Sequence, residues 1–266
     1  MKEKIISVIN QKGGVGKTTT VINLAAGLSV NCKKILVIDL DPQGNATTGL
    51  GLSNVDDTDK SIYGVLNGTV DIHAAIQKTK FENLDIITSN VDLSGLEVET
   101  ADDENRAYLL KVKLASYLNN SSHSYDYVLI DCPPSLSLLT VIALVASDSL
   151  LVPLQTEFFA LEGITQLIKT IDRIKVGLNP NLSVRGILLT MYDKRNRLSA
   201  QVETDARSYF KEKVYQTVVP RNVRLSEAPS HGMPILIYDK QCSGSKSYLK
   251  FTEEFLAQES SYVTAA

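Results

Sequence analysis

The sequence predicts an α/β fold built on a doubly wound, mostly parallel sheet with helices on both faces. Short segments rich in β-branched and apolar residues alternate with stretches of helical pattern along most of the chain. The strand-like segments are apolar almost throughout, as expected for strands that helices cover on both faces. The chain has 266 residues, a length at which an α/β fold commonly forms one domain.

The chain up to residue 103 contains three expected strands. Residues 5–9 (IISVI) are apolar and mostly β-branched, and a glycine-rich turn separates them from a helical stretch over residues 17–28. Residues 35–38 (ILVI) form the second expected strand, and residues 84–87 (LDII) form a weaker third one. The irregular, acidic segment from residue 54 to 103 is expected to form surface helices and loops.

The second half of the chain continues the alternation. The expected strands cover residues 127–130, 150–153 and 186–189, a seventh ends at 218–219, and 235–237 adds an eighth. The helical patterns cover residues 104–118, 136–146, 160–175, 199–210 and 245–257. No linker or repeat interrupts them, so we expect a single domain over residues 1–258 and a flexible C-terminal tail over 259–266.

Composition excludes several classes of protein. Hydrophobic residues make up 44% of the chain and charged residues 21%, which is ordinary for a globular domain and unlike a disordered chain. Lysine and arginine number 27 against 30 acidic residues, giving a net charge of −3. This balance excludes a uniformly basic nucleic-acid-binding protein, although it allows a local basic face.

The sequence gives no sign of a membrane span or a metal site built on cysteines. The longest uncharged run, residues 132–147, holds 16 residues and two prolines, whereas a spanning helix needs ~20 apolar residues. The N-terminal residues of the chain do not have the pattern of a signal peptide. The three cysteines are isolated (Cys32, Cys132, Cys242), without the spacing of a zinc site or a disulfide scaffold. We therefore expect a cytoplasmic protein without membrane contact.

Residues 10–19 (NQKGGVGKTT) have the pattern of a phosphate-binding loop between a strand and a helix. Glycines let successive backbone N–H groups turn toward one anion, and the helix N-terminus adds the positive end of its dipole. We expect Lys17 to reach the β- and γ-phosphates of a nucleotide and the Thr18 hydroxyl to bind Mg²⁺. The expected nucleotide-binding residues of this loop are Lys12, Gly13, Gly14, Val15, Gly16, Lys17, Thr18 and Thr19.

This loop departs from the standard G-x-x-x-x-G-K-[ST] pattern. Gln11 stands where the first glycine is expected, and a second lysine, Lys12, precedes the glycine pair. Lys12 cannot easily serve the same phosphates from the same side as Lys17. It is better placed to leave its own loop and meet a phosphate on another subunit. A glycine-rich turn with a solvated lysine is the alternative, and the strand–loop–helix context argues against it.

Carboxylates follow two of the expected strands. Asp39 and Asp41 come directly after the second strand, and Asp131 ends the fourth strand before two prolines. In open α/β sheets, ligands bind at the carboxyl edge of the strands, where such groups can hold hydrated Mg²⁺ or orient a water molecule. An Asp-Pro turn and an ordinary strand-end aspartate are the alternatives. Beside the loop, the functional interpretation is favoured, with Asp131 contacting Mg²⁺ through water.

The stretch KGGVGKTT resembles the deviant Walker A loop of the ParA/MinD superfamily of P-loop ATPases. The resemblance implies a dimer that sandwiches two ATP molecules, with Lys12 crossing the interface and acting in catalysis beside Lys17. It also implies that Asp41 orients or activates the hydrolytic water. Thr18, Asp41 and Asp131 would then serve the Mg²⁺ site, and Asp39 would support the metal shell.

Three further stretches, residues 155–163, 189–193 and 220–235, are similar to the chromosomal ParA (Soj) type of partitioning ATPase. The resemblance runs from residue 4 to about residue 256 and is weakest between residues 54 and 122. It implies that Pro220 and Asn222 line the adenine pocket. It also implies that residues 155–163 lie near the dimer interface.

One segment of this mildly acidic chain is basic. Residues 185–224 contain nine basic and four acidic residues, which is the pattern of sequence-independent binding to DNA phosphates. A solvated helical face is the alternative, and charge alone favours it. By resemblance, Arg195 and Arg224 match arginines that bind DNA in the Soj group.

The expected function is therefore ATP-dependent DNA partitioning. An ATP-bound homodimer would bind double-stranded DNA non-specifically, on the nucleoid, until a ParB-like centromere-binding partner stimulates hydrolysis. A MinD-like ATPase that positions a complex on a membrane is the main alternative. It would need a basic amphipathic C-terminal helix, but residues 246–256 carry two glutamates and an aromatic stripe typical of core packing. A metabolic P-loop enzyme is the third hypothesis, and the sequence shows no substrate pocket for it.

Overall fold

The computed structural model describes residues 4–52, 60–119 and 125–264, with side chains up to residue 259. An eight-stranded sheet has the strand order β3-β4-β2-β5-β1-β6-β7-β8. All neighbouring strands run parallel except β3, which pairs antiparallel with β4. The strands are β1 (Lys4–Val8), β2 (Ile35–Asp39), β3 (Ile76–Lys78), β4 (Leu84–Ile87), β5 (Tyr127–Asp131), β6 (Ser149–Gln155), β7 (Ser183–Tyr192) and β8 (Val214–Pro220).

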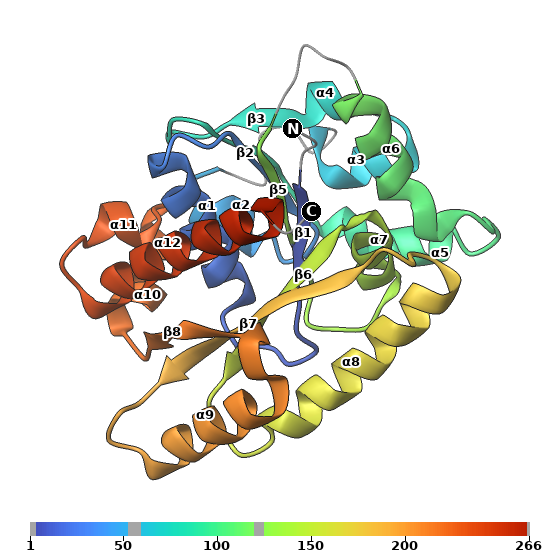
Figure 1. The fold of residues 1–266 in the computed structure, drawn as a ribbon. Coiled ribbons are helices and arrows are strands. Elements are labelled where there is room, and N and C mark those ends of the chain that lie inside the picture. The colour runs from blue at the N-terminus through green and yellow to red at the C-terminus, as the bar shows by residue number, and fades with distance from the viewer. Residues whose placement is uncertain (1–3, 53–59, 120–124, 265–266) are drawn as a thin grey trace.

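Helices connect most of these strands (Figure 1). The longer ones are α1 (Lys17–Val30), α6 (Leu109–Leu118), α7 (Leu138–Ala146), α8 (Ala160–Gly177), α9 (Arg197–Phe210) and α12 (Ser243–Thr264). The short ones are α2 (Asn45–Gly49), α3 (Ile62–Asn67), α4 (Ile72–Ala75), α5 (Leu96–Glu99), α10 (Val223–Glu227) and α11 (Ile235–Tyr238). Single 3₁₀ turns are η2 (Val91–Gly95), η3 (Arg106–Tyr108), η4 (Lys211–Lys213) and η5 (Ala228–His231).

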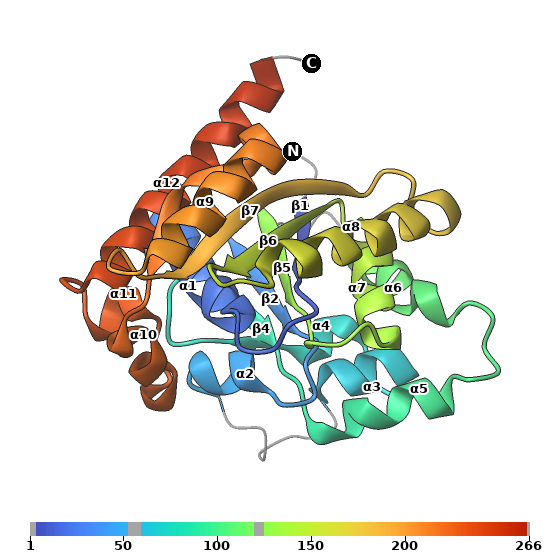
Figure 2. The same cartoon turned by 90° about the horizontal axis from the view of Figure 1, so that it is seen from below.

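Alternate residues of the strands face two different helical layers, because successive side chains of a strand point to opposite faces. On one face, Ile6 and Leu129 join the core under α1 and α12, which lie side by side (Figure 1). On the other face, Val128 packs under α6 and α7, and Ile187 packs under α8 and α9. Figure 2 shows α8, α7 and α6 following one another on this second face. The predicted α/β fold with both faces covered is confirmed.

Three features differ from the sequence predictions. The short edge strand β3 was not expected. Residues 235–237, expected as a strand, form α11, because Pro234 begins a turn there and the Asn23 side chain accepts a hydrogen bond from the Ile235 N–H at 2.7 Å. Helix α12 continues to Thr264, past the expected start of the tail at residue 259, and the last two residues of the expected tail, 265 and 266, lie outside the described residues.

The C-terminal helix is fastened to the sheet. Tyr248, Phe251 and Phe255 of α12 are buried in the core between the sheet and helices α1 and α12, as the aromatic stripe predicted. Glu259 forms ion pairs with Lys4 and with Arg185, where the atoms Oε1 and Nη2 lie 2.7 Å apart. Over the residues that the structure describes, we find no helix with the length and hydropathy needed to cross a membrane.

Candidate nucleotide-binding site

The loop between β1 and α1 has the backbone geometry of an anion cradle. Gly14 and Gly16 adopt φ values of +73° and +91°, which favour glycine because they bring Cβ close to the backbone. Gly16 is the N-cap of α1, and no side chain caps this end of the helix. The first N–H groups of α1 are therefore open to a phosphate, which the helix dipole also favours.

Strands β6 and β7, on one side of β1, brace this loop. Asn10 donates a hydrogen bond from Nδ2 to the Pro153 carbonyl at 2.8 Å and accepts one from the Lys12 N–H at 3.0 Å. On β7, Thr190 donates from Oγ1 to the Val15 carbonyl at 2.8 Å. These contacts support the cradle conformation of the loop, and contacts of this kind lower the ordering cost of binding.

A cavity of about 490 Å³ opens over the loop. Its lining includes Gly13, Gly14, Gly16, Lys17, Thr18, Thr19, Asp41, Gln43, Asn45, Thr48, Pro134, Ser226 and Ser230. Six of these residues belong to the predicted loop, and Asp41 is the predicted catalytic carboxylate. The structure therefore brings the loop and Asp41 together around one space of a size suited to a nucleotide's phosphates.

Lys17 is the cation at the base of this cavity. Lys17 is only 6% exposed, and its Nζ donates a hydrogen bond to the Lys12 carbonyl at 3.1 Å. Burial lowers the pKa of Lys17, while the carboxylates of Asp131 and Asp41 act in the opposite direction. A phosphate would replace the weak carbonyl acceptor with a charged one, and charge-assisted hydrogen bonds are the stronger kind.

Lys12 takes a different position from Lys17. Among the described residues, Lys12 does not belong to the lining of the phosphate cavity, and its Nζ pairs with Glu157 after β6. The two side chains are 52% and 31% exposed. An ion pair this exposed contributes about 0–1 kcal/mol. Lys12 can therefore leave Glu157 at little cost.

Two carboxylates meet beneath the cavity. Asp39 ends β2 and Asp131 ends β5, and the register of these strands places the two residues side by side. Both are completely buried. Burial raises the pKa of Asp39 to about 6, although hydrogen bonds from Thr47 oppose the shift. Burial also raises the pKa of Asp131, and the neighbouring Asp39 charge adds to the rise.

The Asp131 carboxylate suits a hydrated cation. The Thr18 hydroxyl interacts with this carboxylate and opposes the rise of its pKa, and no other side chain donates a hydrogen bond to it among the described residues. A completely buried carboxylate with so little compensation is costly, so such a group calls for a cation or ordered water. Asp131, with Thr18 and Asp41 at the cavity, is an oxygen donor set of the kind that Mg²⁺ prefers.

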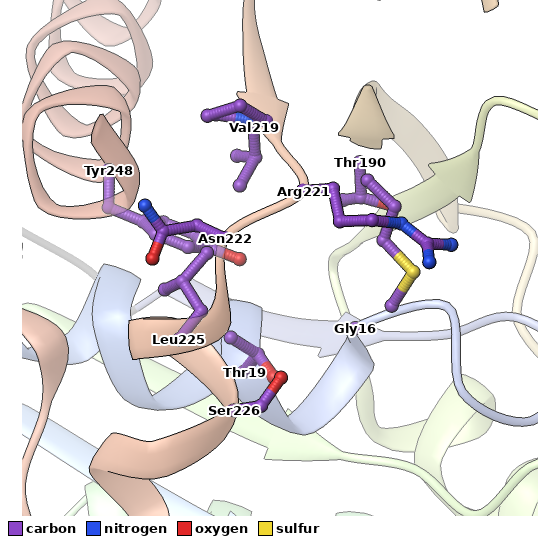
Figure 3. A pocket seen from close by; sticks show the side chains of 11 residues that line it. Gly16, Thr19, Thr190, Val219, Arg221, Asn222, Leu225, Ser226 and Tyr248 are labelled. Atoms are coloured by element: carbon purple, nitrogen blue, oxygen red, sulfur yellow. The ribbon is translucent and has the colours of Figure 1, made fainter. Parts of the chain in front are cut away.

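A second cavity, of about 220 Å³, adjoins the phosphate cavity (Figure 3). It is lined by Gly16, Thr19, Thr190, Met191, Val219, Pro220, Arg221, Asn222, Leu225, Ser226 and Tyr248. In Figure 3, Tyr248 comes from α12, Leu225 from α10 and Thr19 from α1. Asn222 directly precedes α10. The size, the apolar walls and the contact with the loop suit a nucleobase.

Pro220 and Asn222, the residues expected at an adenine, both line this second cavity. The Asn222 side chain also has structural partners. Its Oδ1 accepts from the Arg224 N–H at 2.8 Å, which caps α10, and its Nδ2 donates to Ser243 Oγ at 2.8 Å. Asn222 thus holds α10 against α12 at the edge of the cavity.

Sequence reasoning missed several residues of the site. Met191 lines both cavities with a φ of +51°, a left-handed conformation that a methionine rarely adopts. Tyr248 reaches the second cavity from α12, and its hydroxyl lies 3.1 Å from Thr20 Oγ1. Neither position follows from a local pattern. Both depend on how distant segments pack.

The two arginines expected to bind DNA lie on neighbouring connections. Arg195 follows β7 and Arg224 belongs to α10, and the Arg221 N–H donates to the Tyr192 carbonyl at 3.0 Å between these connections. Arg195 pairs with Asp193 at 3.1 Å, and Arg224 pairs with Glu227 at 2.8 Å. Both arginines are exposed at the surface, so a polyanion could displace these weak pairs.

Not all of the basic segment faces solvent. Arg185 is buried against Phe255, with its guanidinium carbon 4.0 Å from the ring centre, and it pairs with Glu259. Arg207 pairs with Glu203 and donates to the Tyr215 carbonyl at 3.1 Å. The charge count therefore overstated the basic surface, because these two arginines stabilise α9, β8 and α12 instead.

Comparison with known proteins agrees with this geometry. Residues 3–184 match a family described as "AAA domain". The chain is 50% identical over 256 residues to the chromosome partitioning protein ParA of Caulobacter vibrioides, covering 96% of this chain and 95% of that protein. It is 48% identical to the sporulation initiation inhibitor protein Soj of Bacillus subtilis, covering 96% of this chain and 98% of Soj.

A solved structure with bound nucleotide has the same fold. Cobyrinic acid a,c-diamide synthase from Mycobacterium smegmatis with ADP and magnesium superposes with a TM-score of 0.82 at 34% identity. The match covers 97% of this chain and 96% of the other. A nucleotide and magnesium therefore occur together in a protein with this fold.

Proposed function

The chain belongs to the ParA and Soj family of chromosome-partitioning ATPases, and we propose that it partitions DNA through an ATP-dependent cycle of dimerisation and DNA binding. The position of Lys12 carries this proposal. Lys12 lies beside the phosphate cavity, outside its lining, and is held by a weak ion pair to Glu157. A lysine so placed is available to the phosphates of a second copy, where it would neutralise developing charge as an arginine finger does.

The surface next to Lys12 is apolar. Phe158 and Phe159 follow Glu157 and are 73% and 68% exposed, with their rings 5.0 Å apart. Leu136, after β5, is also exposed. Because β5, β1 and β6 are neighbours in the sheet, the loops that follow them share one edge. Exposed aromatic residues beside a site typically mark an interface, and this supports a dimer at the nucleotide edge.

The residues of the cavity divide the work of hydrolysis. We propose that the loop N–H groups and Lys17 bind the phosphates, and that Thr18, Asp41 and Asp131 hold Mg²⁺, which neutralises phosphate charge when bound. Asp41, at the cavity wall, is in position to orient the attacking water. Pro220 and Asn222 would border the adenine ring in the second cavity.

DNA binding would use the surface around Arg195 and Arg224. Lys194, Arg197 and Arg221 are also exposed on the same two connections, and no ion pair engages them among the described residues. A dimer carries two copies of this basic surface. Once one copy binds a DNA duplex, the second is held close to the same duplex, so the dimer binds DNA more tightly than a monomer does. We propose that a ParB-like partner ends this state by stimulating hydrolysis, and that the protein acts in the cytoplasm on the nucleoid.

A membrane-positioning role is less well supported. An amphipathic membrane helix must present its apolar face to lipid. In α12, Tyr248, Phe251 and Phe255 are buried in the core, and Glu259 is fastened by Lys4 and Arg185. Exposing this face to lipid would uncover three aromatic side chains that now stabilise the sheet.

Retention of DNA should depend on nucleotide. In a filter or surface-binding assay with non-specific duplex DNA, we expect strong retention with a non-hydrolysable ATP analogue and Mg²⁺, and weak retention with ADP. Retention should fall steeply as salt rises, because binding to phosphates releases counterions. Replacing Arg195 and Arg224 together with glutamine should weaken retention at every sequence tested. Equal retention with and without nucleotide would contradict the proposed switch.

The apolar edge gives a separate test of the dimer. Replacing Phe158 and Phe159 with serine should weaken ATP-dependent dimerisation by tenfold or more, since burial of one phenylalanine contributes about 1.5–3 kcal/mol. Light scattering with a non-hydrolysable analogue measures the dimer. The melting temperature without nucleotide should not change, because both rings are exposed in the monomer. Val98→Ser, an exposed position on α5, is the matched control. If the double variant dimerises as tightly as the control, Phe158 and Phe159 do not lie in the dimer interface.

A further inference from the structure

Thr47 makes an unusual set of hydrogen bonds at the start of α2. Its backbone N–H and its hydroxyl both donate to Asp39 Oδ2, at 2.8 and 2.7 Å. The same hydroxyl accepts from the Ser89 N–H at 3.1 Å, after β4. Because the Ser89 N–H occupies a lone pair of the hydroxyl, the Thr47 proton is directed toward Asp39. All three residues are buried.

The other oxygen of Asp39 holds the opposite end of the same loop. Asp39 Oδ1 accepts from the Asp41 N–H at 3.3 Å. One carboxylate thus closes the loop between β2 and α2 at both ends. The loop in between carries Asp41 and Gln43, which line the phosphate cavity together with Asn45, the first residue of α2. Asp39 itself is completely buried and does not belong to the described lining.

We propose that Thr47 is a positioning residue for Asp41 and acts through the Asp39 carboxylate. Burial removes competing water, so these hydrogen bonds set the loop conformation more firmly than exposed ones would. The Asp41 carboxylate is then held at the cavity wall before nucleotide arrives. Hydrolysis depends on such placement, because a small displacement of a catalytic group costs much of the rate. The inference rests on the proposed ATPase mechanism for its effect on kcat, whereas the exchange of residues 41–46 needs neither nucleotide nor a second copy and tests the role of Thr47 separately.

Paired substitutions at Thr47 test this role. Thr47→Val keeps the shape and removes the hydroxyl, whereas Thr47→Ser keeps the hydroxyl. We expect Thr47→Val to lower kcat by about tenfold or more, with the KM for ATP changed by less than about threefold. Thr47→Ser should restore kcat to within about threefold of the parent. Hydrogen exchange of the amides of residues 41–46 should become faster in Thr47→Val and should stay unchanged in Thr47→Ser.

Thr217→Val is the matched control, because it removes a buried β8 hydroxyl that has no hydrogen-bond partner among the described residues. It should leave both kcat and the exchange of residues 41–46 unchanged. The proposal is overturned if Thr47→Val has the kcat of this control, or if residues 41–46 keep their exchange rates. Should Thr47→Val fail to fold, Asp39→Asn gives the same test, since it retains only one acceptor oxygen. Normal exchange of residues 41–46 in Asp39→Asn also overturns the proposal.

Discussion

Replacing Lys17 with alanine is expected to abolish ATP binding. The Lys17 ammonium is buried at the base of the phosphate cavity, beside the carboxylates of Asp131 and Asp41. Without it, a triphosphate would meet buried negative charge with no cation from the protein. We expect the dissociation constant for ATP to rise by at least about a hundredfold, which corresponds to ~2.7 kcal/mol. Titration with a fluorescent ATP analogue measures this loss directly.

Lys12→Ala separates the two lysines of the loop. Because Lys12 is not among the described residues that line the phosphate cavity of its own chain, a monomer carrying this change should still bind ATP. Lys12→Ala should instead weaken ATP-dependent dimerisation and slow ATP turnover. Melting curves without nucleotide show whether each variant is folded. If Lys17→Ala binds ATP within about threefold of the parent, the assignment of Lys17 to the phosphates is wrong.

The sequence was sufficient for the features that depend on local pattern. The strands at residues 35–38 and 127–130 are apolar at every position, because helices cover both faces of the sheet there. The cradle at residues 10–19 was predictable for a similar reason. Its glycines, Lys17 and Thr18 are neighbours in sequence, and a strand–loop–helix unit brings them together, while the bracing by Pro153 and Thr190 could not be predicted from this pattern.

Features that depend on tertiary packing could not be predicted in the same way. Strand β3 has three residues and one partner, so its pattern is too short to detect. Residues 235–237 are apolar and partly β-branched, yet a hydrogen bond to Asn23 and the preceding proline select a helical turn. Intrinsic preference is a weak guide where such contacts compete with it.

Charge and site residues show the same limit. A count along the chain includes Arg185 as a basic surface residue, but the fold buries it against Phe255 and Glu259. Met191 and Tyr248 line the second cavity only because β7 and α12 converge there. Thr47 has an ordinary place in the sequence. Its importance follows from three hydrogen bonds to Asp39 and Ser89 that only the folded chain makes.

Asp41→Ala is expected to separate ATP binding from hydrolysis. Asp41 lines the phosphate cavity, whereas the binding loop and Lys17 are held by contacts that do not involve its side chain. ATP affinity should therefore change little, because Thr18 and Asp131 remain to hold Mg²⁺ and Lys17 remains to bind the phosphates. The hydrolysis rate should fall by about a hundredfold or more, as expected when a water-orienting carboxylate is lost. Light scattering under ATP and Mg²⁺ should then show a long-lived dimer.

Asp41→Asn is the control for shape. The Asp41 carboxylate accepts from the Gln43 N–H at 3.0 Å, and an asparagine side chain can keep this bond while losing the charge. If the charge orients the water, Asp41→Asn should be as slow as Asp41→Ala. If only the turn matters, it should hydrolyse ATP at nearly the parent rate. Normal turnover in Asp41→Ala would remove Asp41 from the mechanism.

The assignment to Asp41 follows from comparing the three carboxylates at this edge. Asp39 is completely buried, and both of its oxygen atoms accept hydrogen bonds at the ends of the loop that carries Asp41. Asp131 is also completely buried and lies among Thr18, Lys17 and Asp39, a position that suits a cation better than a water that must attack phosphorus. Asp41 alone of the three lines the described cavity. Loss of hydrolysis with retained binding should therefore be specific to Asp41, whereas loss of Asp131 should impair binding of ATP with Mg²⁺ as well.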